Sequence, residues 1–435
     1  MESLIYASAV TLANQIRNGA VTAQAVVEAH LARIAQVNPR LNAVVQLTAE
    51  AALADAAAAD AALARGQVRG PLHGVPFTIK DWIETADVIC AAGDEARRAY
   101  IPSQDATVVT RLRQAGGIFL GKTNVTVTNP VYGRTNNPYN LDYSPSGSSS
   151  GEAAIIAAGG SPLGLGSDSG GSIRTPAHFC GIAGLKPTTG RVPLTGHYPY
   201  ISVMNDPRTV IGPMARRVED LGLALSIIQG EDWRDPSVVP VPLNDWRTVE
   251  LRPLRVAFYT EHREAEPAPV CKQAAIAAAQ ALAGEVNVVE EKLPPRLDET
   301  YDITRNYWRR PESAALDEWQ ADGPVNLSSE AVEEHLFVWN RFRRGLIQFM
   351  EEYDVIITPA MALPAQPHGQ SEGIIAYTLT YSLVGYPAVI VRVGATADGL
   401  PVGVQVVARP WRDDVALAVA AFLEARFGGW QPPAL

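Results

Sequence analysis

Two serine- and glycine-rich segments lie close together in the sequence, SPSGSSSG at 144–151 and GSDSGGS at 166–172. Flexible linkers have a similar composition, but each segment here precedes a stretch of helical character, EAAIIAA and IRTPAHF. A helix N-terminus presents unpaired N–H groups and the positive end of the helix dipole, which together stabilise developing negative charge. Consecutive glycines also let the backbone approach a ligand closely. The pattern predicts an oxyanion hole at Gly170, Gly171 and Ser172, with a hydroxyl beside it.

A serine hydroxyl becomes a strong nucleophile only when a neighbouring base removes its proton. None of the seven histidines has a triad-like setting, although His178 lies near the clusters in sequence. The letters GSSSG fit G-x-S-x-G with Ser149 at the centre, but the preceding NNPYNLDYSPS is not a strand. Lys80 ends the apolar run GVPFTI, and burial would lower the pKa of its amine from about 10.4. The residues alone leave two readings of Lys80 equally open, a catalytic base and a buried salt bridge with a carboxylate.

A second lysine belongs to a motif whose context contradicts its letters. Residues 116–123, GGIFLGKT, match the phosphate-binding pattern G-x-x-x-x-G-K-[ST]. In a true P-loop the glycine-rich segment joins a strand to a helix, whereas here the letters IFL form the strand itself. The following NVTVTNP cannot begin a helix. We therefore interpret Lys122 as a residue at the end of a strand.

Composition limits the class of protein. The chain has 435 residues, of which 47% are hydrophobic and 19% charged, and its formal net charge is −10. These values predict a globular fold without a nucleic-acid-binding surface, which needs clustered Lys and Arg. The three cysteines lack metal-ligand spacing, so we expect no metal or cofactor. The sequence also shows no signal-peptide pattern and no apolar run of about 18 residues. These features predict a cytoplasmic protein without a membrane partner.

Periodicity in the sequence predicts alternating strands and helices. Thr22 is the expected N-cap of a helix that Pro39 should end, and an alanine-rich helix at about 49–65 should pack at the periphery. We expect further helices at 105–115, 152–158, after Pro269 and at 413–425. Short apolar runs predict strands at 75–79, 117–121, 163–166, 254–258, 286–290, 354–360, 387–393 and 401–408.

This alternation is typical of an α/β fold. We predict a single large domain over residues 1–435, with a central mixed β-sheet covered by helices on both faces. The polar interval at about 230–250 is too short for a linker and should be a surface loop.

Several segments together resemble the amidase signature family, which is an α/β family of Ser-cisSer-Lys amidohydrolases. The resemblance is carried by GVPFTIKD, GKTN, the run from Ser144 to Pro193, IGPMARRVEDL at 211–221, YDVIITPA at 353–360 and GLPVGVQVVA at 399–408. These segments cover nearly the whole chain in order, and a signature core at about 74–193 is highly specific.

The resemblance implies a catalytic triad of Lys80, Ser148 and Ser172. A neutral Lys80 would draw a proton through Ser148 from Ser172, which would attack the substrate carbonyl. Backbone amides of Ser169 to Ser172 would hold the oxyanion, and the peptide bond before Ser148 would be cis. The resemblance also implies that Asp168 and Arg174 form a structural pair and that Ser149 supports the loop.

Other residues are predicted to define the substrate. Trp82, Tyr198, Tyr200, Ile201 and Met204 are apolar or aromatic residues near the signature that could line a pocket.

The chain departs from the family pattern at a few places. Ser146 and Ser150 stand where glycines are usual, Trp82 follows the Lys80-Asp81 pair, and Val127 stands where many relatives carry Glu. These departures affect the expected substrate pocket rather than the triad.

The sequence thus predicts an amidohydrolase that cleaves a small, neutral, partly aromatic amide through a Ser172 acyl-enzyme. Carbamates, anilides and esters are alternative substrates for the same triad. A second reading is the A subunit of a glutamine-dependent aminoacyl-tRNA amidotransferase, and a third is a scaffold on an inactive fold. We expect a monomer or homodimer.

Overall fold

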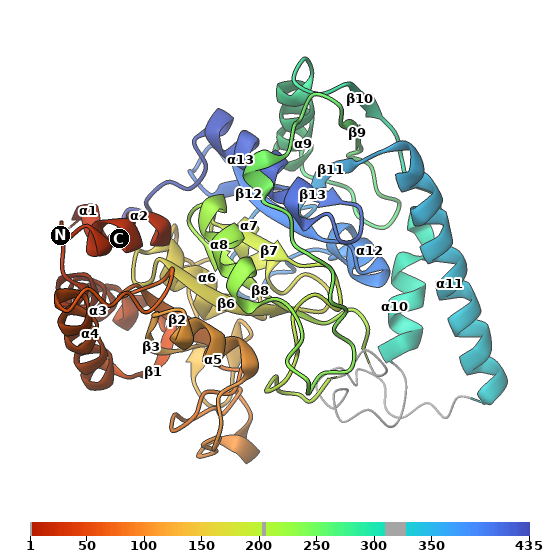
Figure 1. The fold of residues 1–435 in the computed structure, drawn as a ribbon. Coiled ribbons are helices and arrows are strands. Elements are labelled where there is room, and N and C mark those ends of the chain that lie inside the picture. Colours follow the sequence, from red (N-terminus) through yellow and green to blue (C-terminus); the bar gives the residue numbers. More distant parts are fainter. Residues whose placement is uncertain (1, 202–205, 309–327) are drawn as a thin grey trace.

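The computed structural model describes residues 2–201, 206–308 and 328–435. A mixed sheet of 11 strands runs through the centre of the molecule (Figure 1). In spatial order its strands are β1 (Val44–Leu47), β3 (Ile118–Thr123), β2 (Pro76–Lys80), β6 (Leu163–Asp168), β8 (Val210–Ala215), β7 (Ala183–Lys186), β12 (Ala388–Ala395), β13 (Pro401–Ala408), β11 (Val355–Pro359), β9 (Arg255–Phe258) and β10 (Val288–Glu291). The short strands β4 (Thr128–Asn129) and β5 (Gly133–Arg134) form a separate pair.

Both strand directions occur in the large sheet. Strands β3, β2 and β6 are parallel, and so are β11, β9 and β10, whereas the strands between these two groups pair in antiparallel fashion. Strand β8 follows the signature in the chain but lies between β6 and β7. The strands of the signature core therefore do not form a contiguous block.

Helices cover the sheet on two faces, as the sequence predicts. Helices α5, α8, α13 and α9 contact one another in series on one face, and α3, α6 and α7 do so on the other. The helices are α1 (Glu2–Ile5), α2 (Ala9–Arg17), α3 (Ala23–Leu41), α4 (Ala49–Ala64), α5 (Thr107–Gln114), α6 (Ser150–Ala157), α7 (Arg174–Phe179), α8 (Val218–Ile228), α9 (Pro269–Leu282), α10 (Thr300–Trp308), α11 (Ser329–Glu352), α12 (Ala376–Val384) and α13 (Asp413–Phe427).

Helix α3 begins as predicted but ends later. Thr22 is its N-cap and accepts a hydrogen bond from the N–H of Ala25. The expected stop at Pro39 is wrong, because the helix continues to Leu41. A proline so close to a helix end removes only one backbone hydrogen bond, and the fully buried Leu41 holds the last turn in place. Asn42, in the left-handed conformation, ends the helix.

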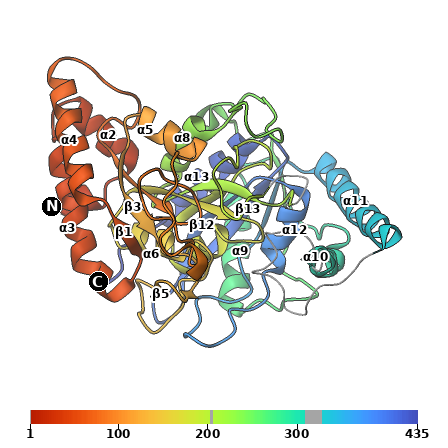
Figure 2. The same cartoon turned by 90° about the horizontal axis from the view of Figure 1, so that it is seen from below.

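The two ends of the molecule differ in composition. The alanine-rich α4 packs on α3 at one end, and α10 and α11 lie at the other in both views (Figures 1 and 2). The predicted loop at 230–250 contains only a short 3₁₀ turn, Trp246–Thr248. None of the described helices combines the length and apolar character needed to span a bilayer.

Candidate active site

Lys80 is the last residue of β2, and neighbouring strands hold it on both sides. Its side chain is fully buried. Its Nζ donates a hydrogen bond to Oγ of Ser148 at 2.6 Å and another to Oγ of Ser167 at 3.0 Å. The same Nζ lies 4.0 Å from the ring centre of Trp82, which covers it with an aromatic face. The amine is thus held between two hydroxyls and a π-surface in a dry setting.

The two serine clusters lie side by side. The peptide bond between Gly147 and Ser148 is cis, as the family resemblance implies. The N–H of Ser149 donates to the carbonyl of Ser172 at 3.2 Å, which joins the loop before α6 to the loop after β6. Ser148 is 7% exposed, and Ser172 is only partly buried. The hydroxyl next to the lysine is therefore enclosed, while Ser172 stays open to a ligand.

Asp168 and Arg174 form a buried pair that fixes the shape of the second loop. The carboxylate of Asp168 accepts two hydrogen bonds from the guanidinium of Arg174, at 2.9 and 2.8 Å. Burial alone would raise the pKa of Asp168, but the charge and hydrogen bonds of Arg174 outweigh it and the pKa is lowered. The other guanidinium hydrogens reach the carbonyl of Thr378, Oε1 of Gln405 and Oγ of Ser382.

The same carboxylate also holds the glycine turn. The N–H of Gly171 donates to Oδ1 of Asp168 at 2.8 Å, and the hydroxyl of Thr378 donates to the carbonyl of Gly170 at 2.6 Å. Gly171 has a φ of 145°, a conformation that side chains rarely adopt. The predicted oxyanion hole included the amide of Gly171, but in the structure this N–H already donates its hydrogen bond to Asp168. The amides of Ser169, Gly170 and Ser172 are the ones on which the prediction now rests.

A buried carboxylate lies below the lysine. Glu152 on α6 accepts hydrogen bonds from the hydroxyls of Thr78 and Thr123, on β2 and β3. Burial raises the pKa of Glu152 to about 7, an effect that these hydrogen bonds and the nearby lysines only partly oppose. Thr78 and Lys80 are two residues apart in β2, so their side chains lie on the same face of the strand. Through the contact between Glu152 and Thr78, α6 therefore anchors the strand that carries the amine.

Lys122 serves a structural contact. It lies within β3, as predicted, and donates to the carbonyl of Ile83 and to the hydroxyl of Thr85. A strand occupies the place where a P-loop would need its glycine-rich turn.

His178 accepts a hydrogen bond from the N–H of Gly403 at 2.8 Å, and burial lowers its pKa to about 4. His178 is therefore a buried packing residue on α7.

The predicted pocket residues fall into two groups. Trp82 and Tyr198 belong to one apolar cluster with Ala92, beside the lysine. Tyr200 is 65% exposed, and with Ile201 it lines a cavity of about 450 Å³ whose lining includes no triad residue. Met204 lies outside the described residues.

The hydrogen bond between Lys80 and Ser167 was not predicted from the sequence. Ser167 lies in β6, next to β2 in the sheet, and directly precedes Asp168. The parallel pairing of two strands that end in GVPFTIK and LGLGS could have indicated it. Among the residues that the structure describes, no group of three His, Cys, Asp or Glu side chains is placed to hold a metal ion.

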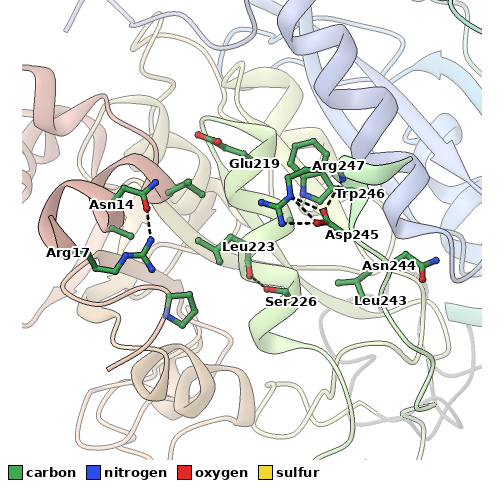
Figure 3. A pocket seen from close by; sticks show the side chains of 14 residues that line it. Asn14, Arg17, Glu219, Leu223, Ser226, Leu243, Asn244, Asp245, Trp246 and Arg247 are labelled. Carbon is green, nitrogen blue, oxygen red and sulfur yellow. Dashed lines mark hydrogen bonds and ion pairs between the residues drawn. The ribbon is translucent and has the colours of Figure 1, made fainter. Parts of the chain in front are cut away.

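A further cavity, of about 530 Å³, lies between α2, α8 and the segment at 243–247 (Figure 3). Its wall carries both acidic and basic side chains, Glu219 and Asp245 beside Arg17 and Arg247. Arg17 donates to Asn14 at 2.5 Å, and Arg247 forms an ion pair with Asp245 at 2.8 Å. Its lining includes none of Lys80, Ser148 and Ser172, the predicted triad.

The fold and these loops define a class of enzyme. The Amidase family model matches residues 25–326 and 313–417, and the chain belongs to the amidase signature family. It is an amide-hydrolysing enzyme.

Individual relatives differ in what they act on. The A subunit of a glutamyl-tRNA(Gln) amidotransferase from Chloroflexus aggregans is 34% identical, with 96% of each chain aligned. An indoleacetamide hydrolase from Bradyrhizobium diazoefficiens is also 34% identical and covers 97% of this chain and 86% of its own. Fatty acid amide hydrolase superposes with a TM-score of 0.89 at 25% identity, over 98% of this chain and 86% of that one.

Proposed function

We propose that this enzyme hydrolyses a small, neutral, partly aromatic amide through an acyl-enzyme on Ser172, with Ser148 and Lys80 as its proton relay. The observation that carries the proposal is the 2.6 Å hydrogen bond between Nζ of Lys80 and Oγ of Ser148. When the amine is uncharged, its lone pair can accept the Ser148 proton along this same contact, which supports the base over the salt-bridge reading of Lys80.

The reaction has two stages. In the first, Oγ of Ser172 forms a bond to the carbonyl carbon while its proton passes to Ser148 and the Ser148 proton passes to Lys80. The C–N bond then breaks, and the leaving nitrogen takes the proton back from the relay. In the second, water attacks the ester of Ser172 by the same route and releases the acid. The amides of Ser169, Gly170 and Ser172 stabilise the oxyanion in both stages.

The preference for a neutral, partly aromatic substrate rests on two observations. The ring of Trp82 lies beside the reacting amine, where it can contact a flat leaving or acyl group. One relative of 34% identity is an indoleacetamide hydrolase. Anilides, carbamates and esters place the same carbonyl carbon in reach of Ser172 and remain alternative substrates.

A second candidate is the A subunit of a glutamine-dependent amidotransferase, because a relative of 34% identity bears that name. The two candidates differ in what the purified chain does alone. We also propose a cytoplasmic location, in keeping with three buried free thiols. A monomer or homodimer stays a prediction.

The test is a substrate panel with purified protein. Aliphatic amides, aryl anilides, aryl carbamates and glutamine are compared by kcat/KM. We expect an aryl amide to be preferred and a burst of released amine where deacylation is slow. Preference for glutamine, or no hydrolysis without its partner proteins, would favour the second candidate.

The nucleophile is tested separately. Ser172→Ala should lower kcat by roughly 10³-fold or more. Ser226→Ala, which changes an exposed serine on α8, is the matched control and should keep full activity. Undiminished turnover in a folded Ser172→Ala variant would contradict the mechanism.

A further inference from the structure

A third cavity, of about 480 Å³, lies beside α11 and has a different character from the two described above. Its wall is formed by α11, the loop after β7, the end of α12 and the turn after β13. The residues used below are Thr189, Arg343, Arg344, Ile347, Tyr386 and Trp411. Its volume falls within the range of about 300–1,000 Å³ that is common for small-molecule sites.

Two residues that line this cavity carry buried hydroxyls for which the described part of the chain provides no hydrogen-bond partner. Tyr386 is 2% exposed, and among the described residues nothing accepts or donates a hydrogen bond at its hydroxyl. The same holds for the buried hydroxyl oxygen of Thr189. Leaving a buried polar group unsatisfied costs about 1–3 kcal/mol, so such groups call for an explanation. Burial also raises the pKa of Tyr386, which keeps its proton available for donation.

The cavity carries positive charge that its own wall does not neutralise. Arg343 is half-buried and Arg344 exposed, and no Asp or Glu is found among the described residues that line the cavity. Partial burial lowers the pKa of the Arg343 guanidinium. In the cavity of Figure 3, by contrast, Arg247 forms an ion pair with Asp245, and the wall also contains Glu219. An anion is the partner that the cavity beside α11 lacks.

Apolar surface completes the wall. The ring of Trp411 and the side chain of Ile347 lie beside the polar groups, together with Val384 and Pro410. A bare inorganic anion would leave this surface uncovered, whereas a flat organic group would bury it.

We propose that this cavity is a second binding site, separate from the serine and lysine site, for a small organic carboxylate that carries a flat apolar group. The carboxylate accepts hydrogen bonds from Arg343, and from the hydroxyls of Tyr386 and Thr189 after a small shift of the wall that opens these two closed-off groups to the cavity. The flat group lies against Trp411 and Ile347. Arg344 adds charge at the mouth of the cavity.

The test is binding of 4-fluorobenzoate, followed by isothermal titration calorimetry and ¹⁹F NMR. All variants also carry Ser172→Ala, so that differences in hydrolytic activity between them cannot affect the measured Kd. We expect saturable binding, with Kd raised about tenfold in Arg343→Gln and about five-fold in Tyr386→Phe. Neutral 4-fluorobenzyl alcohol should bind far more weakly.

Controls separate this site from other binding. Arg341→Gln changes an arginine on the same helix that pairs with Glu299 outside the cavity, and it should leave Kd unchanged. If Arg343→Gln does not fold, the Kd of Tyr386→Phe still tests the proposal. This change removes only one oxygen, which has no hydrogen-bond partner among the described residues. No saturable binding, or equal Kd in Tyr386→Phe and its parent, would overturn the proposal.

Discussion

The loop after β6 and the cavity beside α11 both bury charged and hydroxyl side chains, but they differ in how these groups are satisfied. Around Asp168, each oxygen of the carboxylate accepts hydrogen bonds from the guanidinium or the glycine turn. Beside α11, the hydroxyls of Thr189 and Tyr386 find no partner among the described residues. A satisfied network fixes one geometry, whereas the unsatisfied hydroxyls are the groups on which the proposed binding site rests.

Helix α12 connects the two regions. Thr378 in its first turns contacts both Gly170 and the guanidinium of Arg174. Gly385 and Tyr386, which follow its last residue, line the cavity. The four changes below probe the difference between the regions, in order of expected effect.

Removing the amine of Lys80, the proposed base, should have the largest effect, and on activity alone. Lys80→Met should lower kcat by about 10⁴-fold, because Ser148 would lose the acceptor of its proton. The measurement is single-turnover acylation, with thermal unfolding to check the fold. Lys122→Met is the matched control, since Lys122 is a buried lysine on the adjacent strand. It should lower stability while the acylation rate of the folded protein stays within about ten-fold of the parent.

Breaking the satisfied network should cost stability as well as activity. Arg174→Met leaves Asp168 buried without its partner and should lower the free energy of unfolding by about 3–5 kcal/mol. Urea unfolding measures this. A change below about 1 kcal/mol would mean that the pair does not hold the loop. Replacing the exposed Arg98, which pairs with Glu95, should have almost no effect.

Glu152 should make stability depend on pH. Its pKa is raised from 4.5 to about 7, so the folded protein keeps a proton that the unfolded chain has already lost. This contribution is complete below pH 4.5 and is lost as the pH rises through 7. In Glu152→Gln, the free energy of unfolding should therefore fall less over this window, by about 1–3 kcal/mol. Urea unfolding at several pH values measures the slope, and Glu330→Gln, on the exposed start of α11, should match the parent.

The smallest effect belongs to the unsatisfied region. Tyr386→Phe removes a hydroxyl that has no hydrogen-bond partner among the described residues and should change the free energy of unfolding by less than about 0.5 kcal/mol, or raise it. Tyr377→Phe is the comparison, because its hydroxyl donates to the carbonyl of Thr260 at 2.6 Å, and its loss should destabilise the protein by about 1 kcal/mol. Equal losses in the two variants would remove the contrast between the regions.

Local sequence predicted the elements that carry the candidate site, while the triad itself was implied by the family resemblance and stays a prediction. Lys80 ends a short apolar run, and the glycine turn before α7 is visible in the letters, so strand, loop and helix follow from neighbours in the chain. Ser167 was missed because its contact with Lys80 depends on the pairing of β2 with β6. The engagement of Gly171 by Asp168 depends on a turn geometry that the letters do not specify.

The cavity beside α11 could not be predicted in this way. Thr189, Arg343 and Tyr386 come from distant parts of the chain and meet only through tertiary packing. The same reason explains Tyr200 and Ile201, which lie near the signature in sequence but line a cavity apart from the triad. Pro39 shows the opposite limit, because a strong local signal was overridden by the burial of Leu41.

The guanidinium of Arg174 has a consequence for how the enzyme is made. Its partners Thr378, Ser382 and Gln405 are translated more than 200 positions after it. While the nascent polypeptide is still on the ribosome, the loop of Ser172 therefore has its carboxylate but not its other tethers. We expect this loop to reach its final shape only after synthesis of the segment that contains Gln405, so a premature stop codon before that point should yield an inactive product.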